Sequence, residues 1–179
     1  AQVYGRAIVC GNSEVFGYAR VFGNAKVYEN SQVYGISLIY DYARVFGTAK
    51  VFGNVKVFDY AEIFDNASVY DYAEVFARAT VGGNSEVFGY ARVFGNARVF
   101  GAAKVYGNSR IYDDAIVYEN AVVSENAKVY GSAKIYGHAK IYGDAEVYSF
   151  AEVFGNAAVD FLMVRNNKWN TELKKKAII

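Results

Sequence analysis

The chain has 179 residues, enough for one domain, and its 19 Lys plus Arg are nearly balanced by 18 Asp plus Glu. This balance gives no reason to expect a nucleic acid or an anionic membrane as a partner, and no apolar run is long enough to span a bilayer. Zero prolines, 17 glycines, 17 tyrosines and 13 phenylalanines indicate instead a periodic molecule.

The chain begins at Ala1 without an initiator Met and contains one cysteine, Cys10. A single cysteine excludes an internal disulfide and says little about the compartment. The missing Met suggests trimming of an export signal, as in an extracellular or cell-surface protein. A sequence cut from a longer chain at this residue would also begin without Met.

A six-residue unit repeats 27 times, without insertion or deletion, from Ala1 to Leu162. Position one is Ala in 21 units, Ser in five and Val once, and position three is always Val or Ile. Position four is Tyr or Phe in 23 units, the exceptions being Cys10, Gly82, Ser124 and Asp160. A fixed six-residue period indicates a β-solenoid.

Each unit predicts a short strand followed by a corner. Positions one to four alternate sides as a strand requires, and pairs such as Gly-Asn or Asp-Tyr supply the corner. A meander of hairpins would leave the Ala/Val side uncovered, whereas a coil closes that side on itself. Three units per turn give about nine 18-residue coils, a prism roughly 43 Å long at the usual strand spacing.

The spacing of an aliphatic residue and a small residue four positions later, as in Val21 to Ala25 and Val27 to Ser31, runs through residues 1–162. In this the chain resembles the hexapeptide-repeat, left-handed parallel β-helix family. The resemblance implies an all-β, left-handed, three-sided parallel β-helix; the hand comes from the resemblance alone, because crossovers generally prefer the right hand. One departure is that the family usually has a small or acidic residue where this chain has a ring.

Strand parity predicts that the rings lie outside. Position two points to the same side as position four and is Lys, Arg or Glu in 18 of the 27 units. Charges in such numbers cannot be buried in an apolar core. The predicted core is therefore Ala, Ser, Val and Ile, and the rings form ladders on all three faces.

Only the ladder on the first face is unbroken, because Gly82 and Ser124 interrupt the other two and Asp160 ends one of them. Contiguous apolar surface of this kind marks a contact site. Arg92, Arg110 and Lys128 add a basic stripe beside it, which an acidic partner or a glycan could use. The predicted interaction surface is this stripe with Tyr4, Phe22, Tyr40, Phe58, Phe76, Phe94, Tyr112, Tyr130 and Tyr148.

The corners after the second face carry a column of asparagines, whose amides are expected to bond from coil to coil. The column contains Asn12, Asn30, Asn66, Asn84, Asn120 and Asn156. Acidic corners such as Asp41 or Asp113-Asp114 suggest calcium binding, but the repeated Gly and Asp pattern of calcium-binding β-rolls is absent.

The only histidine, His138, falls in the same column. In acyltransferases of the family that the chain resembles, a catalytic histidine works between subunits, often beside a long loop, and no such loop interrupts the repeat through Leu162. Metal-dependent carbonic anhydrases of that fold need three histidines, and this chain has one. Ice-binding solenoids need arrays of Thr, and only Thr48, Thr80 and Thr171 are present. His138 is therefore predicted to be a turn residue, and we predict no catalytic, cofactor-binding or metal-binding residue.

The last 17 residues, 163–179, leave the repeat and are predicted to form a separate cap or tail, with a short helix beginning at Asn170 or Thr171. The N-terminus enters the repeat in frame, which predicts a bare edge. The predicted capping residues, apolar side chains at or near the end of the repeat, are Phe150, Phe161, Leu162, Met163, Trp169 and Leu173.

These features favour a non-enzymatic scaffold that self-associates, laterally through the ladders or end to end through the bare edge, in the second case as a fibre. The alternative is a carbohydrate-binding or adhesive module that uses the ladders. An acyltransferase with a site between subunits ranks third. The expected partners are another copy of the chain or a glycan, with no nucleic acid, no membrane insertion and no cofactor.

Overall fold

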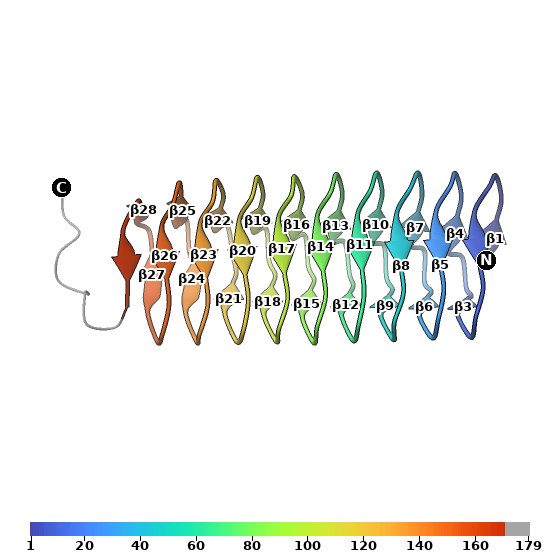
Figure 1. Ribbon diagram of the computed structural model, residues 1–179, viewed down its shortest axis with the longest axis horizontal. Coiled ribbons are helices and arrows are strands. Elements are labelled where there is room, and N and C mark those ends of the chain that lie inside the picture. Colours follow the sequence, from blue (N-terminus) through green and yellow to red (C-terminus); the bar gives the residue numbers. More distant parts are fainter. Residues whose placement is uncertain (171–179) are drawn as a thin grey trace.

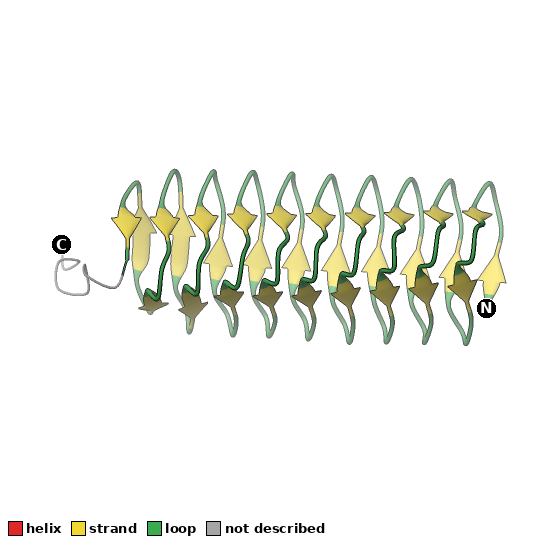
Figure 2. Cartoon of the chain, turned by 60° about the horizontal axis from the view of Figure 1, so that its bottom comes forward, coloured by secondary structure: helices red, strands yellow, loops and turns green. Residues whose placement is uncertain are grey.

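A computed structural model describes residues 1–170. In that part of the chain, short parallel strands form three sheets that run along an elongated coil (Figure 1), with no helix among them. The view in Figure 2 shows one strand of each sheet in every complete coil, joined by corners. The predicted all-β, three-sided solenoid is confirmed.

The first sheet contains β1 (Gln2–Val3), β4 (Arg20–Val21), β7 (Leu38–Ile39), β10 (Lys56–Val57), β13 (Glu74–Val75), β16 (Arg92–Val93), β19 (Arg110–Ile111), β22 (Lys128–Val129), β25 (Glu146–Tyr148) and β28 (Met163–Arg165). The second contains β2 (Ile8–Val9), β5 (Lys26–Val27), β8 (Arg44–Val45), β11 (Glu62–Ile63), β14 (Thr80–Val81), β17 (Arg98–Val99), β20 (Ile116–Val117), β23 (Lys134–Ile135), β26 (Glu152–Val153) and β29 (Lys168–Trp169). The third contains β3 (Glu14–Val15), β6 (Gln32–Val33), β9 (Lys50–Val51), β12 (Ser68–Val69), β15 (Glu86–Val87), β18 (Lys104–Val105), β21 (Val122–Val123), β24 (Lys140–Tyr142) and β27 (Ala158–Asp160).

The register of these sheets confirms the 18-residue coil. Gln2 pairs with Arg20 and Val3 with Val21, and the same offset joins neighbouring strands as far as β27. Equivalent positions of successive coils therefore lie directly above one another. This alignment is what turns a sequence repeat into columns of identical side chains.

The core consists of positions one and three of the units. From Ala19 to Val159 its Ala, Val and Ile side chains are at most 1% exposed, and Ser31, Ser37, Ser85 and Ser109 are equally buried. The Ser31 hydroxyl donates a hydrogen bond of 2.8 Å to the carbonyl of Tyr28, which satisfies it in the corner. The prediction that small side chains fill the bore and the rings remain outside is confirmed.

Every described corner has position five in the left-handed backbone region. Glycine occupies most of these positions, as at Gly101 (φ 71°), but Asp and Glu occupy many others, as at Glu119 (φ 58°). The acidic side chains have a partner: Glu119 Oε2 accepts the Gly137 N–H at 2.8 Å, and Asp59 Oδ2 accepts the Ala77 N–H at 3.1 Å. An acid at position five thus satisfies the backbone donor one coil further on.

The parallel pairing continues beyond the last complete unit. Met163 pairs with Glu146 and Lys168 with Glu152, offsets of 17 and 16 residues in place of 18. β28 and β29 thus begin a tenth coil with shorter corners, although residues 163–179 leave the six-residue period. Trp169 ends the inward column of the second sheet and is 7% exposed.

The two ends of the described chain differ in burial. In the first coil Val3 is 48% exposed and Ala7, Val9 and Val15 are only partly buried, while Val164 near the other end is 2% exposed. The strands β1, β2 and β3 form the outer edge of the three sheets. Residues 171–179, which contain most of the predicted helix and Leu173, lie outside the described residues.

Candidate interaction surface

The outward side of the first sheet, called here the first face, carries a continuous ladder of nine rings. Their centroids lie 4.8–5.1 Å apart and their planes are within 7° of parallel. These rings are Tyr4, Phe22, Tyr40, Phe58, Phe76, Phe94, Tyr112, Tyr130 and Tyr148, the set predicted from the sequence. The strand register alone brings them together, because each ring lies 18 residues from the next.

The ladder rings stack face to face along the long axis, and most are half-buried. Each inner ring therefore has a neighbouring ring against both faces. What such a ring presents to solvent is its edge and, for tyrosine, its hydroxyl. An aromatic edge carries the positive part of the ring quadrupole, so the exposed surface is apolar but lacks open π faces.

The second-face ladder is interrupted at Gly82, as predicted, and the neighbouring ring fills the gap. A Cβ at Gly82 would lie 2.4 Å from Phe64 Cζ, so the Phe64 ring lies where a side chain would be. Phe64 accordingly stacks less closely on Phe46, at 5.5 Å and 14°. On the third face Ser124 is buried, and rings stack without interruption only from Phe16 to Tyr106.

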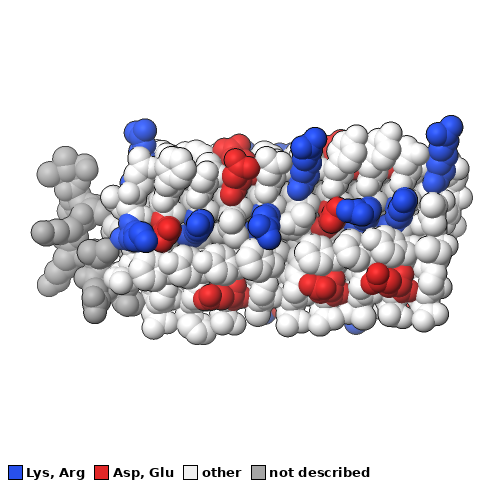
Figure 3. Space-filling model, viewed as in Figure 1, with Lys and Arg blue, Asp and Glu red and all other residues white. Residues whose placement is uncertain are grey.

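Charged side chains on the first face pair largely with one another. Lys56 Nζ and Arg92 Nε each lie 3.0 Å from a carboxylate oxygen of Glu74, and Lys128 Nζ lies 2.8 Å from Glu146 Oε1. The Arg92 guanidinium carbon also lies 5.2 Å from the centre of the Phe76 ring. Of the predicted basic stripe, only Arg110 lacks an ion pair within residues 1–170. Figure 3 shows a similar mixture of acidic and basic groups on the face that it views.

Glu146 joins the ladder to the charged row beside it. The Tyr130 hydroxyl donates to Glu146 Oε2 at 3.0 Å, while Lys128 donates to Oε1. The Lys128 and Tyr130 hydrogen bonds lower the pKa of Glu146. Desolvation and the bond to Glu146 raise the pKa of Tyr130 to about 12. The third face repeats this arrangement with Tyr70, Glu86 and Lys104.

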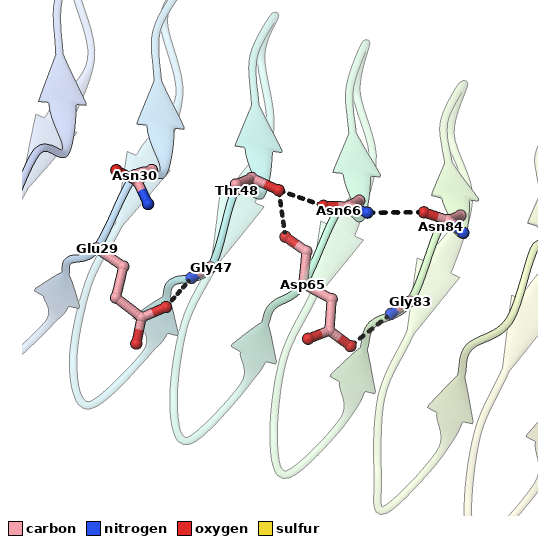
Figure 4. Close-up of a pocket in the computed structure, with 8 residues that line it drawn as sticks. All are labelled: Glu29, Asn30, Gly47, Thr48, Asp65, Asn66, Gly83 and Asn84. Atoms are coloured by element: carbon pink, nitrogen blue, oxygen red, sulfur yellow. Dashed lines mark hydrogen bonds between the residues drawn. The ribbon is translucent and has the colours of Figure 1, made fainter.

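The asparagine column forms hydrogen bonds between coils in part. Asn12 Nδ2 donates to Asn30 Oδ1 at 3.1 Å and Asn66 Nδ2 to Asn84 Oδ1 at 2.9 Å, while Thr48 donates to Asn66. Figure 4 shows this row beside the Glu29 and Asp65 carboxylates, which accept the backbone N–H groups of Gly47 and Gly83. An open groove runs along these corners after the second sheet. Most polar groups that line this groove form hydrogen bonds with one another.

His138 lies exposed in the same column, and its backbone N–H donates to the Gly155 carbonyl at 2.7 Å. No described carboxylate or hydroxyl bonds to its ring. Cys10 is exposed in the first coil. His138 thus occupies a corner position, and Cys10 occupies position four, where most units have an aromatic ring.

Two further ring stacks, at the corners, were not predicted. Tyr42 stacks on Tyr60 at 5.0 Å in the corner after the first sheet, called here the first corner. Tyr72 stacks on Tyr90 at 4.9 Å in the corner after the third sheet, the third corner. All four are more than half exposed. The sequence contains the signal, since each pair occupies position six one coil apart. Position six varies between Asn, Tyr and other residues, so its period is weaker than that of position four.

The predicted capping residues do not converge in the described part of the chain. Phe150, Phe161 and Met163 are 76%, 72% and 70% exposed, and Leu162 is 36% exposed. Met163 occupies an outward position because it pairs with Glu146. Only Trp169 enters a core column, and Leu173 lies outside the described residues.

Residues 1–170 contain no group of three or more His, Cys, Asp or Glu side chains placed to hold a metal ion. In the same part of the chain no helix is long and apolar enough to cross a bilayer.

A family model described as the YdcK beta solenoid repeat matches residues 91–107 and 109–125. Each match spans almost one coil, the first beginning at β16 and the second at β19. No curated protein matches the chain. The match and the parallel sheets together support a repeat β-helix.

Proposed function

We propose that this protein is a non-enzymatic scaffold that self-associates laterally through its first face. The observation that carries the proposal is the unbroken nine-ring ladder on a face whose charges are mostly paired within the chain. Paired charges lose less on burial than unpaired ones would, because each keeps its partner when water is removed. We also propose that the chain belongs to the hexapeptide-repeat, left-handed parallel β-helix family. The spacing of an aliphatic and a small residue in its repeat supports this assignment.

The size of the first face suits a specific contact. Nine coils of about 4.8 Å, and positions one to four of each unit at about 3.3 Å per residue, give a projected area of about 43 by 13 Å. That is on the order of 550 Å², near the lower end of what each partner contributes to a specific interface. Leu38 adds an apolar side chain at position two, beside Phe22 and Tyr40.

The ladder geometry favours this proposal over carbohydrate binding along the ladders. A sugar stacks its C–H groups on an aromatic face, whereas inner ladder rings have both faces covered. The acyltransferase proposal remains third: a general base needs a substrate pocket and an orienting partner, and neither is seen around His138 within the described residues.

The test is sedimentation velocity over a hundredfold range of concentration, with the charge variant Leu38→Glu. Leu38 pairs in register with Arg20 and Lys56, so the new carboxylate gains two favourable neighbours and the fold tolerates it. We expect at least a tenfold weaker self-association, because an apolar contact is replaced by a charge. A concentration-independent monomer of the unmodified protein would overturn the proposal.

Val122→Glu is the matched control on the third face. Val122 pairs with Lys104 and Lys140, so this substitution places the same carboxylate between two cations outside the first face. We expect it to leave self-association unchanged. An equal loss in both variants would assign the effect to net charge and not to the first face.

End-to-end contact through β1, β2 and β3 is the other arrangement to be tested. Val9→Lys places a cation in the inward column of the first coil, where only the open edge is disturbed. Lateral association survives this change, whereas an end-to-end fibre seen by electron microscopy would be lost.

A further inference from the structure

The third corner contains a hollow that belongs to no ladder. Its walls are Ile36 and Tyr72, which are 50% and 52% exposed, and Asn54 lies between them. Asp71 borders the hollow, and Tyr18, 84% exposed, extends the lining beyond Ile36. These residues come from four successive coils on one edge of the prism.

Tyr72 has an open aromatic face in this hollow. One face stacks on Tyr90 at 4.9 Å, while the residue one coil before it in the column is Asn54 and not a ring. This is the feature that the inner ladder rings lack. An open face beside a polar side chain allows a ligand ring to stack while its substituents form hydrogen bonds.

The separation of the walls fits one ring. Ile36 and Tyr72 occupy equivalent positions two coils apart, which at the usual strand spacing is about 9.6 Å. A ring in van der Waals contact with both walls needs about 3.5–4.0 Å on each side, or about 7–8 Å in all. Asn54 occupies the position between these walls, and its side chain is shorter than that of Tyr72, so the ring lies above the Asn54 amide. The space there suits a puckered saccharide ring.

Polar groups without protein partners lie beside this space. The half-buried Asn54 side chain has no hydrogen bond within residues 1–170, whereas Asn66 and Asn126 donate to side chains one coil further on. The Asp71 carboxylate, in contrast, is directed to the following coil, where its Oδ2 accepts the Gly89 N–H at 3.3 Å. A free primary amide can both donate to and accept from the hydroxyls of a ligand.

We propose that this hollow is a binding site for a neutral carbohydrate. The C–H side of one pyranose ring lies on Tyr72, and its hydroxyls bond to the Asn54 amide. The Asp71 carboxylate, which forms no ion pair within residues 1–170, lies in the adjoining corner and disfavours phosphate or uronic acid, since it would repel an anion. The site lies on the third corner and is independent of the first-face contact, so either proposal can fail without the other.

Saturation-transfer NMR with D-glucose, D-galactose, D-mannose and N-acetyl-D-glucosamine at millimolar concentration tests the site. A single open subsite predicts weak binding, so at least one of the four sugars should receive saturation. Asn54→Tyr should abolish the signal by filling the space with a ring stacked on Tyr72, as Tyr42 stacks on Tyr60. Tyr72→Ala should abolish it by removing the aromatic face.

Tyr42→Ala is the control. Tyr42 is also 52% exposed, stacks on one ring and has an asparagine, Asn24, one coil before it. Two coils before it, however, lies Arg6 in place of Ile36, so the second apolar wall is missing there. This substitution should leave the signal unchanged. The absence of saturation transfer to all four sugars would overturn the proposal, and so would a signal that survives Asn54→Tyr. Circular dichroism of each variant shows that the solenoid is retained.

Discussion

At the scale of single residues, the corner sets the strictest demand on the sequence. Position five needs a left-handed backbone, which costs an ordinary residue roughly 1–2 kcal/mol relative to glycine. Glycine avoids this cost, and Asp or Glu offsets it by accepting the N–H of the next coil, as Glu119 does from Gly137. The mixture of Gly, Asp and Glu at this position therefore has one physical cause.

Gly101→Ala should destabilise the solenoid by about 1–3 kcal/mol, from backbone strain and a steric clash. Its φ is 71°, and a Cβ would lie 2.6 Å from the Glu119 nitrogen. Thermal unfolding followed by circular dichroism measures the effect. The reciprocal change Ala77→Gly, at φ 60°, should raise the unfolding midpoint. Shifts of the same sign in both variants would contradict this account.

Stability should also depend on pH through Tyr130 and Glu146. The pKa of Tyr130 is raised from its ordinary 10.0 to about 12, so its contribution is present below pH 10 and is lost between pH 10 and 12. The pKa of Glu146 is lowered from 4.5, so its contribution is present above that pH and is lost as the pH falls through the folded value.

Phenolate absorbance during an alkaline titration measures the tyrosine part of this prediction. Tyr70 and Tyr130, each bonded to a carboxylate, should ionise late, near pH 12. Tyr130→Phe should remove one late ionisation. Tyr148→Phe changes a ring of the same ladder that has no described bond to a carboxylate, and it should leave that late step in place.

At the scale of elements, the strands are too short to be stable alone and depend on the columns that they form. Most contain two residues, and each column adds one contact per coil. In the first-face ladder this contact is a stacked ring pair, worth about 0.5–1.5 kcal/mol beyond area burial. An inner ring contributes two such contacts and a terminal ring one.

Phe76→Ala should therefore cost more than Phe154→Ala. Phe76 stacks on Phe58 at 4.8 Å and on Phe94 at 4.9 Å, whereas Phe154 ends its ladder on Tyr136 at 5.2 Å. We expect a difference of about one stacked pair, or ~1 kcal/mol, in denaturant unfolding. Equal costs would show that stacking adds little to simple burial. Gly82 shows that the fold tolerates a missing ring.

At the scale of the whole molecule, the protein is quasi-one-dimensional, since each coil contacts only its neighbours. Removal of a complete coil should preserve the fold because the register of every column is kept. Deletion of residues 91–108 joins Tyr90 to Ser109 in the same frame of the repeat. Its circular dichroism per residue should match that of the unmodified chain.

Deletion of residues 91–99 is the matched out-of-frame control. It leaves Phe100, Gly101 and Ala102 as three extra residues between Tyr90 and Ala103. Within a strand they would direct rings toward the bore, which has no room for them, so they must form an enlarged corner. We expect a lower unfolding midpoint than for the in-frame deletion, and equal midpoints would contradict the proposed cause of the fold.

The sequence predicted the fold closely because one local pattern is repeated in every coil. The period of Ala1, Ala7 and Ser13 and the charges at position two were enough to place the core inside and the rings outside. Tertiary contacts between different columns were not predictable in this way. The Lys128–Glu146–Tyr130 group depends on side-chain reach across positions two and four, and the pairing of Met163 and Trp169 depends on corners that shorten without a period.

The sequence by itself determined the coil length, the composition of the core and the nine rings of the first-face ladder, because a strict period fixes which residues lie above one another. Only the tertiary structure decided that ring faces are covered along the ladders and that Tyr72 keeps one open. It also decided that most first-face charges pair internally. These outcomes depend on distances between side chains of different coils, which a one-dimensional pattern does not contain.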